Sequence, residues 1–416
     1  MDAEGSLSKL MPNSENNHPR ITWVTRSFLD YRVPVYEQLN SLINGRLTLL
    51  YYRDVVPDRV SKKVTNALGR NAVGMTGEIR FTGKKSQKEK MANTRLRLPY
   101  QPGLIKAIAR SKPDVLVSDG FFQWTYAALW LRALKNIPHV MCYERNAHTE
   151  RNAQWYRTAY RKFARRWIDA ICCSGRLCGE YVQSLGFPVE KTTFGHMVAD
   201  TAGLQNDAAN MTDIRISELK ARYDLKGTVF LYIGQLIPRK GLIELLNAWK
   251  VFTGSVSADE ATLFVVGDGS QRQECESFCS SKSLRNVRFA GAIDYDELAP
   301  YYKAADVFVI PTLEDNWSLV VPEAMACGLP ILCSKYNGCW PELVHSGENG
   351  WVFDPLDTED TLRSLRAAME NKDSLRAMGE RSRVIVGSHT AGHAAATILE
   401  ACKIAVCRTT EEGHSL

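Results

Sequence analysis

Short strand-like segments alternate with helical segments along almost the whole chain, and this alternation restricts the fold more than any other feature. In the C-terminal half, helical patterns such as GLIELLNAWKVF separate the strand-like segments TVFLYIG, ATLFVVGDG, VRFAG, DVFVIPT and PILCS. The N-terminal half has the same rhythm, with ITWVT, LTLLYY, PDVLVSDG, PHVMCYE and DAICCS as strands. Strands that alternate with helices form parallel sheets. We therefore predict an α/β fold with two Rossmann-like, doubly wound domains that face each other across a cleft.

The length of 416 residues supports two domains, because a single core rarely grows beyond about 250–300 residues. We predict a disordered leader over 1–17, an N-terminal domain over 18–205, a C-terminal domain over 206–390, and a helix and tail over 391–416 that packs back on the N-terminal domain. Residues 53–97 have no clear periodicity and are expected to be irregular. Residues 200–227 are predicted to be a linker with one short helix, ISELKARYDL.

Composition excludes several classes of protein. Hydrophobic residues make up 45% of the chain and charged residues 24%, which is typical of globular proteins and not of disordered or fibrous ones. The net charge of +6 is too small to predict a nucleic-acid partner. The 11 cysteines have no paired C-x-x-C spacing, and no signal peptide or stretch of about 20 apolar residues is present. We therefore expect reduced thiols and a cytoplasmic protein.

Two loops that follow predicted strands contain glycine. In YIGQLIPRKG the strand ends at Gly234, and Arg239 and Lys240 stand where the next helix is expected to begin. Free backbone N–H groups and two cations at a helix start favour a phosphate site. The alternative is a pair of solvated basic residues. In VVGDG, Gly267 allows a ligand to approach the backbone closely, although this signal is weak.

A third loop, TLEDNWSLVVPEAMACGLP (312–330, the acid loop), carries three acids. Glu314 and Asp315 precede an apolar run, and Glu323 lies at the start of a predicted helix. The residues alone leave three interpretations open: a general acid/base pair, a ligand clamp, or helix caps.

Five motifs occur in a fixed order between residues 228 and 370. They are G-x5-K-G, VVGDG, ADVFVIPT, an acid followed after seven residues by EAMACGLPI, and PELVHSGENGWVF. Together they resemble the nucleotide-sugar domain of retaining GT-B glycosyltransferases, specifically glycosyltransferase family 4 (glycosyl transferases group 1). The N-terminal half resembles that family only in its rhythm of strands and helices. The resemblance implies a GT-B fold with an N-terminal acceptor domain and a C-terminal nucleotide-sugar-binding domain.

The resemblance also implies roles for residues of the C-terminal domain. Glu323 would accept hydrogen bonds from the ribose hydroxyls, and its place at a helix N-terminus would keep it ionised. Asp315 would hold hydroxyls of the donor sugar, and Lys240, helped by Arg239, would bind the diphosphate. The family pattern makes Glu314 a flanking surface acid. The remaining expected donor-binding residues are Gly234, Gly267, Asn316, Trp317, Ser318 and Leu319, of which the last three would present backbone N–H groups.

In the N-terminal domain, the family places a polar group against the donor sugar after a strand. HVMCYERNAH is the corresponding segment, and it makes Glu144 and His148 candidates for catalysis.

The chain departs from the family pattern in three places. Gln235 stands where an arginine is often found, and Ser318 replaces a glycine of the acid-loop motif. The glycine-rich loop after the first strand is replaced by one with Arg26, Ser27, Asp30 and Arg32, which suggests contact with an anionic donor or acceptor.

The resemblance implies no cofactor and no metal, only a nucleotide-diphosphate sugar as donor substrate. Asp294 and Asp296 have the D-x-D spacing of a metal site, but they precede a helical pattern and are better explained by capping. The implied activity is a hexosyltransferase-type reaction of EC class 2.4, with a saccharide or lipid-linked acceptor, in the synthesis of cell-surface polysaccharide or glycoconjugate. The alternatives are an epimerase or phosphorylase on the same fold, and a catalytically weak sugar-nucleotide-binding protein or partner subunit.

The segment RNAQWYRTAYRKFARRW (151–167) predicts an amphipathic helix. Tyr156, Tyr160, Phe163 and Trp167 lie on one face at helical spacing, and basic residues fill the remainder. Two interpretations stay open: a core-facing aromatic stripe with a solvated basic face, or a face that rests on anionic lipid at the inner side of a membrane.

Overall fold

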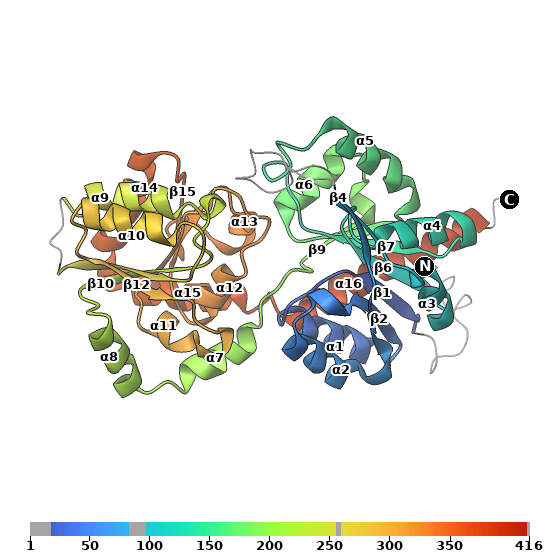
Figure 1. The fold of residues 1–416 in the computed structure, drawn as a ribbon, viewed down its shortest axis with the longest axis horizontal. Coiled ribbons are helices and arrows are strands. Elements are labelled where there is room, and N and C mark those ends of the chain that lie inside the picture. Colours follow the sequence, from blue (N-terminus) through green and yellow to red (C-terminus); the bar gives the residue numbers. More distant parts are fainter. Residues whose placement is uncertain (1–17, 83–96, 255–258, 414–416) are drawn as a thin grey trace, which may run out of the picture.

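The computed structural model describes residues 18–82, 97–254, 259–413, and the predicted leader over 1–17 lies outside them. Two parallel sheets organise the chain, one in each half (Figure 1). The first has the order β3-β2-β1-β6-β7-β8-β9, and the second has the order β12-β11-β10-β13-β14-β15. The predicted α/β fold with two Rossmann-like sheets is therefore confirmed.

The N-terminal sheet consists of seven strands: β1 (Ile21–Thr25), β2 (Leu47–Tyr52), β3 (Ala72–Met75), β6 (Val115–Asp119), β7 (His139–Tyr143), β8 (Ala170–Cys173) and β9 (Thr192–Phe194). The helices of this half are α1 (Arg32–Leu42), α2 (Asp58–Leu68), α3 (Leu104–Ser111), α4 (Thr125–Lys135), α5 (Trp155–Ala164) and α6 (Arg176–Ser184). A separate antiparallel hairpin pairs β4 (Ile79–Thr82) with β5 (Arg97–Tyr100).

The C-terminal sheet consists of β10 (Thr228–Ile233), β11 (Ala261–Val266), β12 (Val287–Gly291), β13 (Val307–Ile310), β14 (Ile331–Ser334) and β15 (Gly350–Phe353). Its helices are α7 (Thr201–Ala209), α8 (Asp213–Arg222), α9 (Leu242–Phe252), α10 (Arg272–Ser281), α11 (Ala299–Lys303), α12 (Val320–Ala326), α13 (Trp340–Leu343), α14 (Thr358–Glu370) and α15 (Leu375–Val386). The last helix is α16 (Ala391–Gly413).

Strand β10 shows why the C-terminal sheet is covered on both faces. Its side chains alternate, so that Val229 and Leu231 pack into the cluster with α7, α11 and α12, while Phe230 and Tyr232 pack into the cluster with α9, α10 and α14. All four are buried. A strand that is apolar on both sides needs such a central place in a parallel sheet. Figure 1 shows the two groups of helices on opposite sides of this sheet.

The final helix α16 leaves the C-terminal half and packs against the N-terminal sheet (Figure 1). Its buried residues Ala394, Ile398, Ala401 and Cys402 share a cluster with β1 and α1. The small side chains of Ala394, Ala401 and Cys402 let the helix lie close to the sheet.

Two stretches are more regular than their sequence suggested. The prediction that 53–97 is irregular is wrong for α2, whose Val60, Val64 and Leu68 recur at helical spacing and are buried. Residues 200–227 form two helices, α7 and α8, instead of the one that was expected. Over the described part of the chain, none of the helices combines the length and the apolar character needed to span a bilayer.

Helix α5 is rotated relative to its predicted orientation. Its buried residues are Arg157, Arg161 and Ala164, whereas Tyr156 and Phe163 are exposed. The prediction of a core-facing aromatic stripe with a solvated basic face is therefore wrong for these residues. The arginines turn inward because Arg161 pairs with the buried carboxylate of Glu150 at 2.7 Å.

Candidate functional site

The charged centre of the site lies where two neighbouring strands of the C-terminal sheet end. Lys240 closes the short 3-10 turn Pro238–Lys240 after β10, and Asp315 lies in the loop after β13. Because β10 and β13 are adjacent and parallel, their following loops meet at one edge. There Lys240 Nζ donates to Asp315 Oδ2, and so does Ser318 Oγ.

This arrangement sets the charge of Asp315. Burial alone would raise the pKa of the carboxyl group, but the charge of Lys240 and the hydrogen bonds from Lys240 and Ser318 outweigh burial. The pKa of Asp315 therefore lies below its usual value, and the centre is a partly buried, charge-balanced ion pair.

The loop that carries Asp315 is fixed by a second loop, after β14. The N–H of Ser318 donates to Asn337 Oδ1 at 3.3 Å, and the N–H of Trp317 donates to Asp315 Oδ1 at 3.3 Å. Two of the N–H groups that were expected to face a donor are thus bonded within the protein. Ser318 does not have positive φ, so the replacement of glycine at this position causes no backbone strain. Leu319 directly precedes α12.

Close packing at the loop tips depends on two glycines. Gly267, with φ of +138°, lies so close to Gly234 that a Cβ atom would sit 1.9 Å from the carbonyl oxygen of Gly234. A Cβ atom on Gly338 would sit 1.8 Å from the carbonyl oxygen of Asn316. Both contacts exclude any larger residue and hold the ends of neighbouring strands together.

Arg239 and Gln235 occupy different surroundings. The guanidinium of Arg239 donates to the carbonyl oxygen of Glu314 at 3.4 Å, and the backbone carbonyl of Arg239 accepts from the N–H of Leu313 at 2.8 Å. Gln235 is exposed. Arg239 therefore fixes the acid loop and lies close enough to Asp315 for its charge to lower the pKa of that carboxyl group.

Glu323 lies apart from the ion pair, in the first turn of α12. It is buried, and Tyr302 Oη donates to its Oε2 at 2.9 Å. Burial is the largest influence and, with the nearby charge of Asp200, raises the pKa of Glu323 to about 7. The helix N-terminus therefore does not keep Glu323 fully ionised at neutral pH, because one hydrogen bond and a short helix do not offset desolvation.

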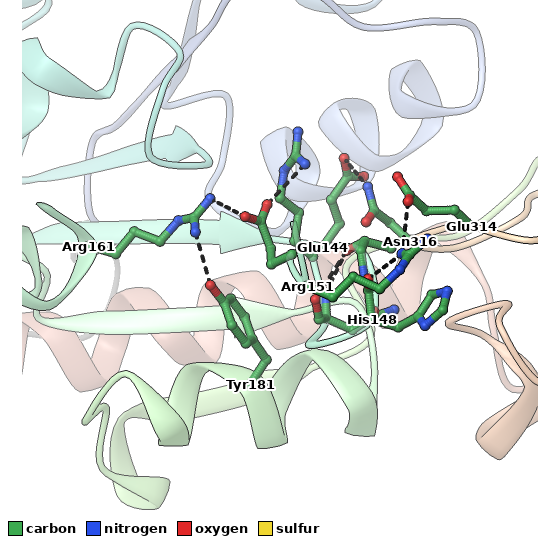
Figure 2. Close-up of polar contacts among 11 residues, drawn as sticks. Glu144, His148, Arg151, Arg161, Tyr181, Glu314 and Asn316 are labelled. Atoms are coloured by element: carbon green, nitrogen blue, oxygen red, sulfur yellow. Dashed lines mark hydrogen bonds and ion pairs between the residues drawn. The ribbon is translucent and has the colours of Figure 1, made fainter. Parts of the chain in front are cut away.

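The candidate residues of the N-terminal domain reach the acid loop directly (Figure 2). Glu144 follows β7 and accepts a hydrogen bond from Asn316 Nδ2 at 3.3 Å. Burial raises the pKa of Glu144 above its usual value. The positive charges of Arg145 and Arg32 lower this pKa, and the negative charges of Asp119 and Asp315 raise it. His148 Nε2 donates to the carbonyl oxygen of Leu313 at 2.9 Å, and burial lowers the pKa of its imidazole.

Glu314 is not the surface acid that was predicted. It is buried, and Arg151 of the N-terminal domain donates to its Oε2 at 2.9 Å (Figure 2). The other carboxylate oxygen, Oε1, has no hydrogen-bond partner among the described residues. This pair joins the two halves of the chain, and removal of its arginine would leave the carboxylate buried and unpaired.

We expect Arg151→Ala to lower thermal stability, because it leaves the Glu314 carboxylate buried and unpaired. The cost should be roughly 1–3 kcal/mol, below that of a fully buried pair because the Arg151 side chain is 33% exposed. Thermal unfolding should show Arg151→Ala/Glu314→Gln to be more stable than Arg151→Ala alone. The control is Arg381→Ala, which breaks an exposed pair with Glu348 and should cost less than about 1 kcal/mol. Equal losses of stability in Arg151→Ala and Arg381→Ala would show that the interdomain pair contributes no more to stability than an exposed ion pair.

A second acid of the C-terminal half, Glu342 of α13, contacts the N-terminal domain but was not predicted from the sequence. Its carboxylate accepts from the N–H of Arg176 at the start of α6, at 2.5 Å. The ring of Trp317 packs beside the same turn, so close to Gly175 that a Cβ atom there would lie 2.6 Å from it. Nothing in the local sequence indicates this contact, since it joins elements 166 residues apart.

The basic loop after β1 does not offer free cations. Arg26 pairs with Glu78 at 2.8 Å, and Arg32 is buried, where it donates to the carbonyl oxygen of His196 at 2.6 Å. The expectation that this loop contacts an anionic ligand stays a prediction, since both arginines already have partners within the protein.

The D-x-D sequence forms neither of the features that its spacing suggests. Asp294 precedes the 3-10 turn Tyr295–Glu297, but its side chain makes no capping hydrogen bond, so the predicted cap is wrong. Within the described ranges, no group of three or more His, Cys, Asp or Glu side chains is placed to hold a metal ion.

Family models match most of both halves of the chain. The model of glycosyl transferases group 1 matches residues 215–385, and the model of glycosyltransferase family 4 matches residues 80–201. The chain therefore belongs to glycosyltransferase family 4 (glycosyl transferases group 1). The predicted resemblance is thus confirmed, and it extends to the N-terminal half, where only the rhythm of strands and helices had indicated it.

Solved structures share the GT-B fold over nearly the whole chain. This chain is similar to HepE of Anabaena, which was solved in complex with UDP and glucose. The two are 14% identical with a TM-score of 0.67, and the match covers 93% of this chain and 100% of HepE. It is also similar to a glycosyltransferase of Rickettsia africae, with 13% identity, a TM-score of 0.68, and coverage of 93% and 99%. At this level of identity the likeness establishes the fold alone.

Among curated relatives, sulfoquinovosyl transferase SQD2 of Arabidopsis thaliana is 24% identical over 302 residues, which are 69% of this chain and 56% of that protein. A GDP-mannose-dependent phosphatidylinositol monomannoside mannosyltransferase of Mycobacterium tuberculosis is 26% identical over 190 residues, 44% of this chain and 49% of that protein. The matched part of the chain thus spans about half the length of these relatives.

Proposed function

We propose that the protein is a retaining glycosyltransferase that moves a sugar from a nucleotide-diphosphate donor to a saccharide or lipid-linked acceptor. One observation carries the proposal. Lys240, Asp315 and Ser318 form a bonded group at the carboxyl edge of the C-terminal sheet, and the same loop meets Glu144 and His148 of the other domain. Ligands of open α/β sheets bind at this edge.

Lys240 supplies the positive charge that transfer from a nucleotide diphosphate requires. As the bond from the sugar to the diphosphate breaks, negative charge grows on the leaving phosphate and positive charge on the anomeric carbon. In the proposed reaction the ammonium of Lys240, supported by Arg239, stabilises the leaving group electrostatically. Asp315, which is ionised and already holds Lys240, orients hydroxyls of the donor sugar.

Glu323 is proposed to bind the ribose of the nucleotide. Its buried carboxylate already accepts one hydrogen bond from Tyr302, and two hydroxyls of a ribose would satisfy its remaining acceptor sites. Such donors favour the ionised form, so binding should lower the pKa of Glu323 from about 7. Glu323 is therefore a binding residue in this proposal, and the acid/base pair with Asp315 is rejected.

Glu144 and His148 complete the proposed site from the N-terminal domain. Glu144 reaches Asn316, next to Asp315, and its raised pKa makes it a candidate to share a proton with the acceptor hydroxyl. His148 bonds to the backbone of the acid loop and stacks on Tyr336 with ring centroids 4.5 Å apart. We assign His148 to positioning this loop.

The names of relatives support a nucleotide-diphosphate donor. HepE of Anabaena was solved with UDP-glucose, and the mycobacterial relative is described as GDP-mannose-dependent. The proposed donor class is therefore a UDP- or GDP-hexose.

A thermal-shift panel tests the donor class. UDP-glucose, GDP-mannose, UDP, GDP and the matching monophosphates are added to the protein, and the melting temperature is measured. A bound donor at 100 times its Kd should stabilise the fold by about 2.7 kcal/mol, which corresponds to a rise of several degrees. Diphosphates should exceed monophosphates, because Lys240 is proposed to bind the diphosphate. If no nucleotide raises the melting temperature, the proposed donor class is wrong.

A further inference from the structure

Helix α5 presents aromatic side chains to solvent. Trp155 is 80% exposed, Tyr156 41% and Phe163 52%. Helical spacing puts positions 155, 156, 159, 162, 163 and 166 on one outer stripe, so Lys162 and Arg166 lie between the aromatic rings. Large exposed aromatic groups at this density usually mark a contact surface.

The inward contacts of α5 fix this orientation. Arg161 donates to Tyr181 Oη at 3.0 Å (Figure 2). It also pairs with Glu150 at 2.7 Å. The guanidinium of Arg157 lies 4.8 Å from the ring centroid of Phe122. Any rotation that buried the outer aromatic rings would break the contacts of Arg161 with Glu150 and Tyr181, and the buried Glu150 would keep only Arg145 as an ion-pair partner. The aromatic exposure is therefore a property of the folded chain.

Cations surround a hollow beside the outer stripe. The hollow has a volume of about 500 Å³ and is lined by Lys162, Phe163, Arg165, Arg166 and residues 183–186. Arg165 donates to the carbonyl oxygen of Gly186 at 3.1 Å, and the guanidinium of Arg166 lies 5.3 Å from the ring of Phe163. No ion pair with a carboxylate neutralises these three cations within the described residues.

We propose that this α5 face (Trp155, Tyr156, Lys162, Phe163, Arg165 and Arg166) docks on the surface of an anionic lipid bilayer. Tryptophan and tyrosine rings favour the headgroup level of a membrane, and each basic residue near an anionic surface adds attraction. The hollow is open and has room for a lipid phosphate group, and three of its lining residues are cations. Lysine is depleted at protein interfaces, and the cations of this face meet no carboxylate within the described residues, so charge complementarity favours an anionic lipid surface.

Docking would place the candidate site close to the lipid surface. His148, which contacts the acid loop, precedes Trp155 by only seven residues in the chain. A lipid-borne acceptor would then approach the N-terminal side of the site. This consequence rests on the proposed function, whereas docking itself does not.

Vesicle co-sedimentation of the full chain tests the proposal. Vesicles contain phosphatidylcholine alone or with phosphatidylglycerol, at low and at high salt. The wild type should sediment with the anionic vesicles at low salt. Lys162→Ser/Arg166→Ser should bind them about 30-fold more weakly, and Trp155→Ser/Phe163→Ser should also bind weakly. Lys250→Ser/Val251→Ser, which removes an exposed cation and an exposed apolar residue from α9, should bind like the wild type.

Three outcomes would overturn docking on anionic lipid. They are the absence of wild-type binding to anionic vesicles at low salt, equal binding to neutral vesicles, and wild-type binding by both α5 variants. Melting temperatures must match the wild type, which shows that the outer substitutions leave the fold intact. Sedimentation without lipid tests whether a second copy of this chain binds the α5 face instead. If the wild type dimerises and the α5 variants do not, the face joins two copies and the lipid assignment is wrong. Nucleotides should raise the melting temperature of both α5 variants as they do for the wild type. The test of membrane docking is therefore independent of the test of donor binding.

Discussion

Replacing Lys240 with alanine should lower kcat for donor turnover by about 10²–10³-fold, the usual effect of removing one preorganised electrostatic group. Lys240 is the cation bonded to Asp315 at the carboxyl edge of the sheet, and in the proposed reaction it faces the leaving diphosphate. The measurement is the initial rate with the nucleotide-diphosphate sugar that gives the largest thermal shift. Lys250→Ala, which removes an exposed lysine of the following helix, should leave the rate unchanged.

A second variant separates this catalytic effect from loss of stability. Lys240→Ala leaves the partly buried Asp315 carboxylate without its ammonium partner, and that alone destabilises the protein. Lys240→Ala/Asp315→Asn removes both charges and should recover much of the lost stability. Its rate should nevertheless stay as low as that of Lys240→Ala. If the double variant recovers both stability and rate, Lys240 stabilises the fold and not the leaving group.

Replacing Glu323 with glutamine should stabilise the protein at pH 8 while it weakens donor binding. Burial raises the pKa of Glu323 from 4.5 to about 7. Between these two pH values the unfolded chain has lost the proton that the folded chain keeps, so stability falls as the pH rises. Over this span of about 2.5 pH units the loss is roughly 3 kcal/mol, and glutamine, which does not ionise, avoids it. The melting temperatures of Glu323→Gln and wild type should therefore differ most above pH 7 and converge below pH 5.

Donor binding should move in the opposite direction. The ionised carboxylate accepts hydrogen bonds from ribose hydroxyls, so wild-type affinity should increase as the pH rises through about 7. Glu323→Gln should bind roughly 10- to 100-fold more weakly at pH 8 and lose this pH dependence. Glu370→Gln on the exposed side of α14 is the control and should change neither property. A glutamine variant with wild-type affinity would remove Glu323 from the proposed ribose site.

The C-terminal sheet could be predicted from the sequence because its strands are apolar on both faces. Segments such as TVFLYI and ATLFVV became β10 and β11 with nearly the predicted bounds. The loops at their ends carry motifs with fixed spacing, which predict Lys240 and Asp315 in one site, and these two side chains are bonded in the structure. Both kinds of signal are local in the chain.

Contacts between distant segments could not be predicted in the same way. The burial of Glu314 depends on Arg151, and the cap that Glu342 provides for α6 depends on how the two domains meet. The orientation of α5 was predicted wrongly because hydrophobic periodicity favoured the aromatic stripe, while a buried carboxylate, Glu150, fixed the arginines inward. In α2 the opposite happened: Val60, Val64 and Leu68 gave a usable helical signal that the polar surroundings obscured.

The most direct test of the proposed donor site is calorimetric titration with the nucleotide-diphosphate sugar that gives the largest thermal shift. Wild type, Lys240→Ala/Asp315→Asn, Glu323→Gln and Glu370→Gln are compared at pH 8. The proposed site predicts that both site variants bind at least about tenfold more weakly while Glu370→Gln binds like the wild type. Wild-type affinity in both site variants would contradict the assignment of this edge of the sheet as the donor site.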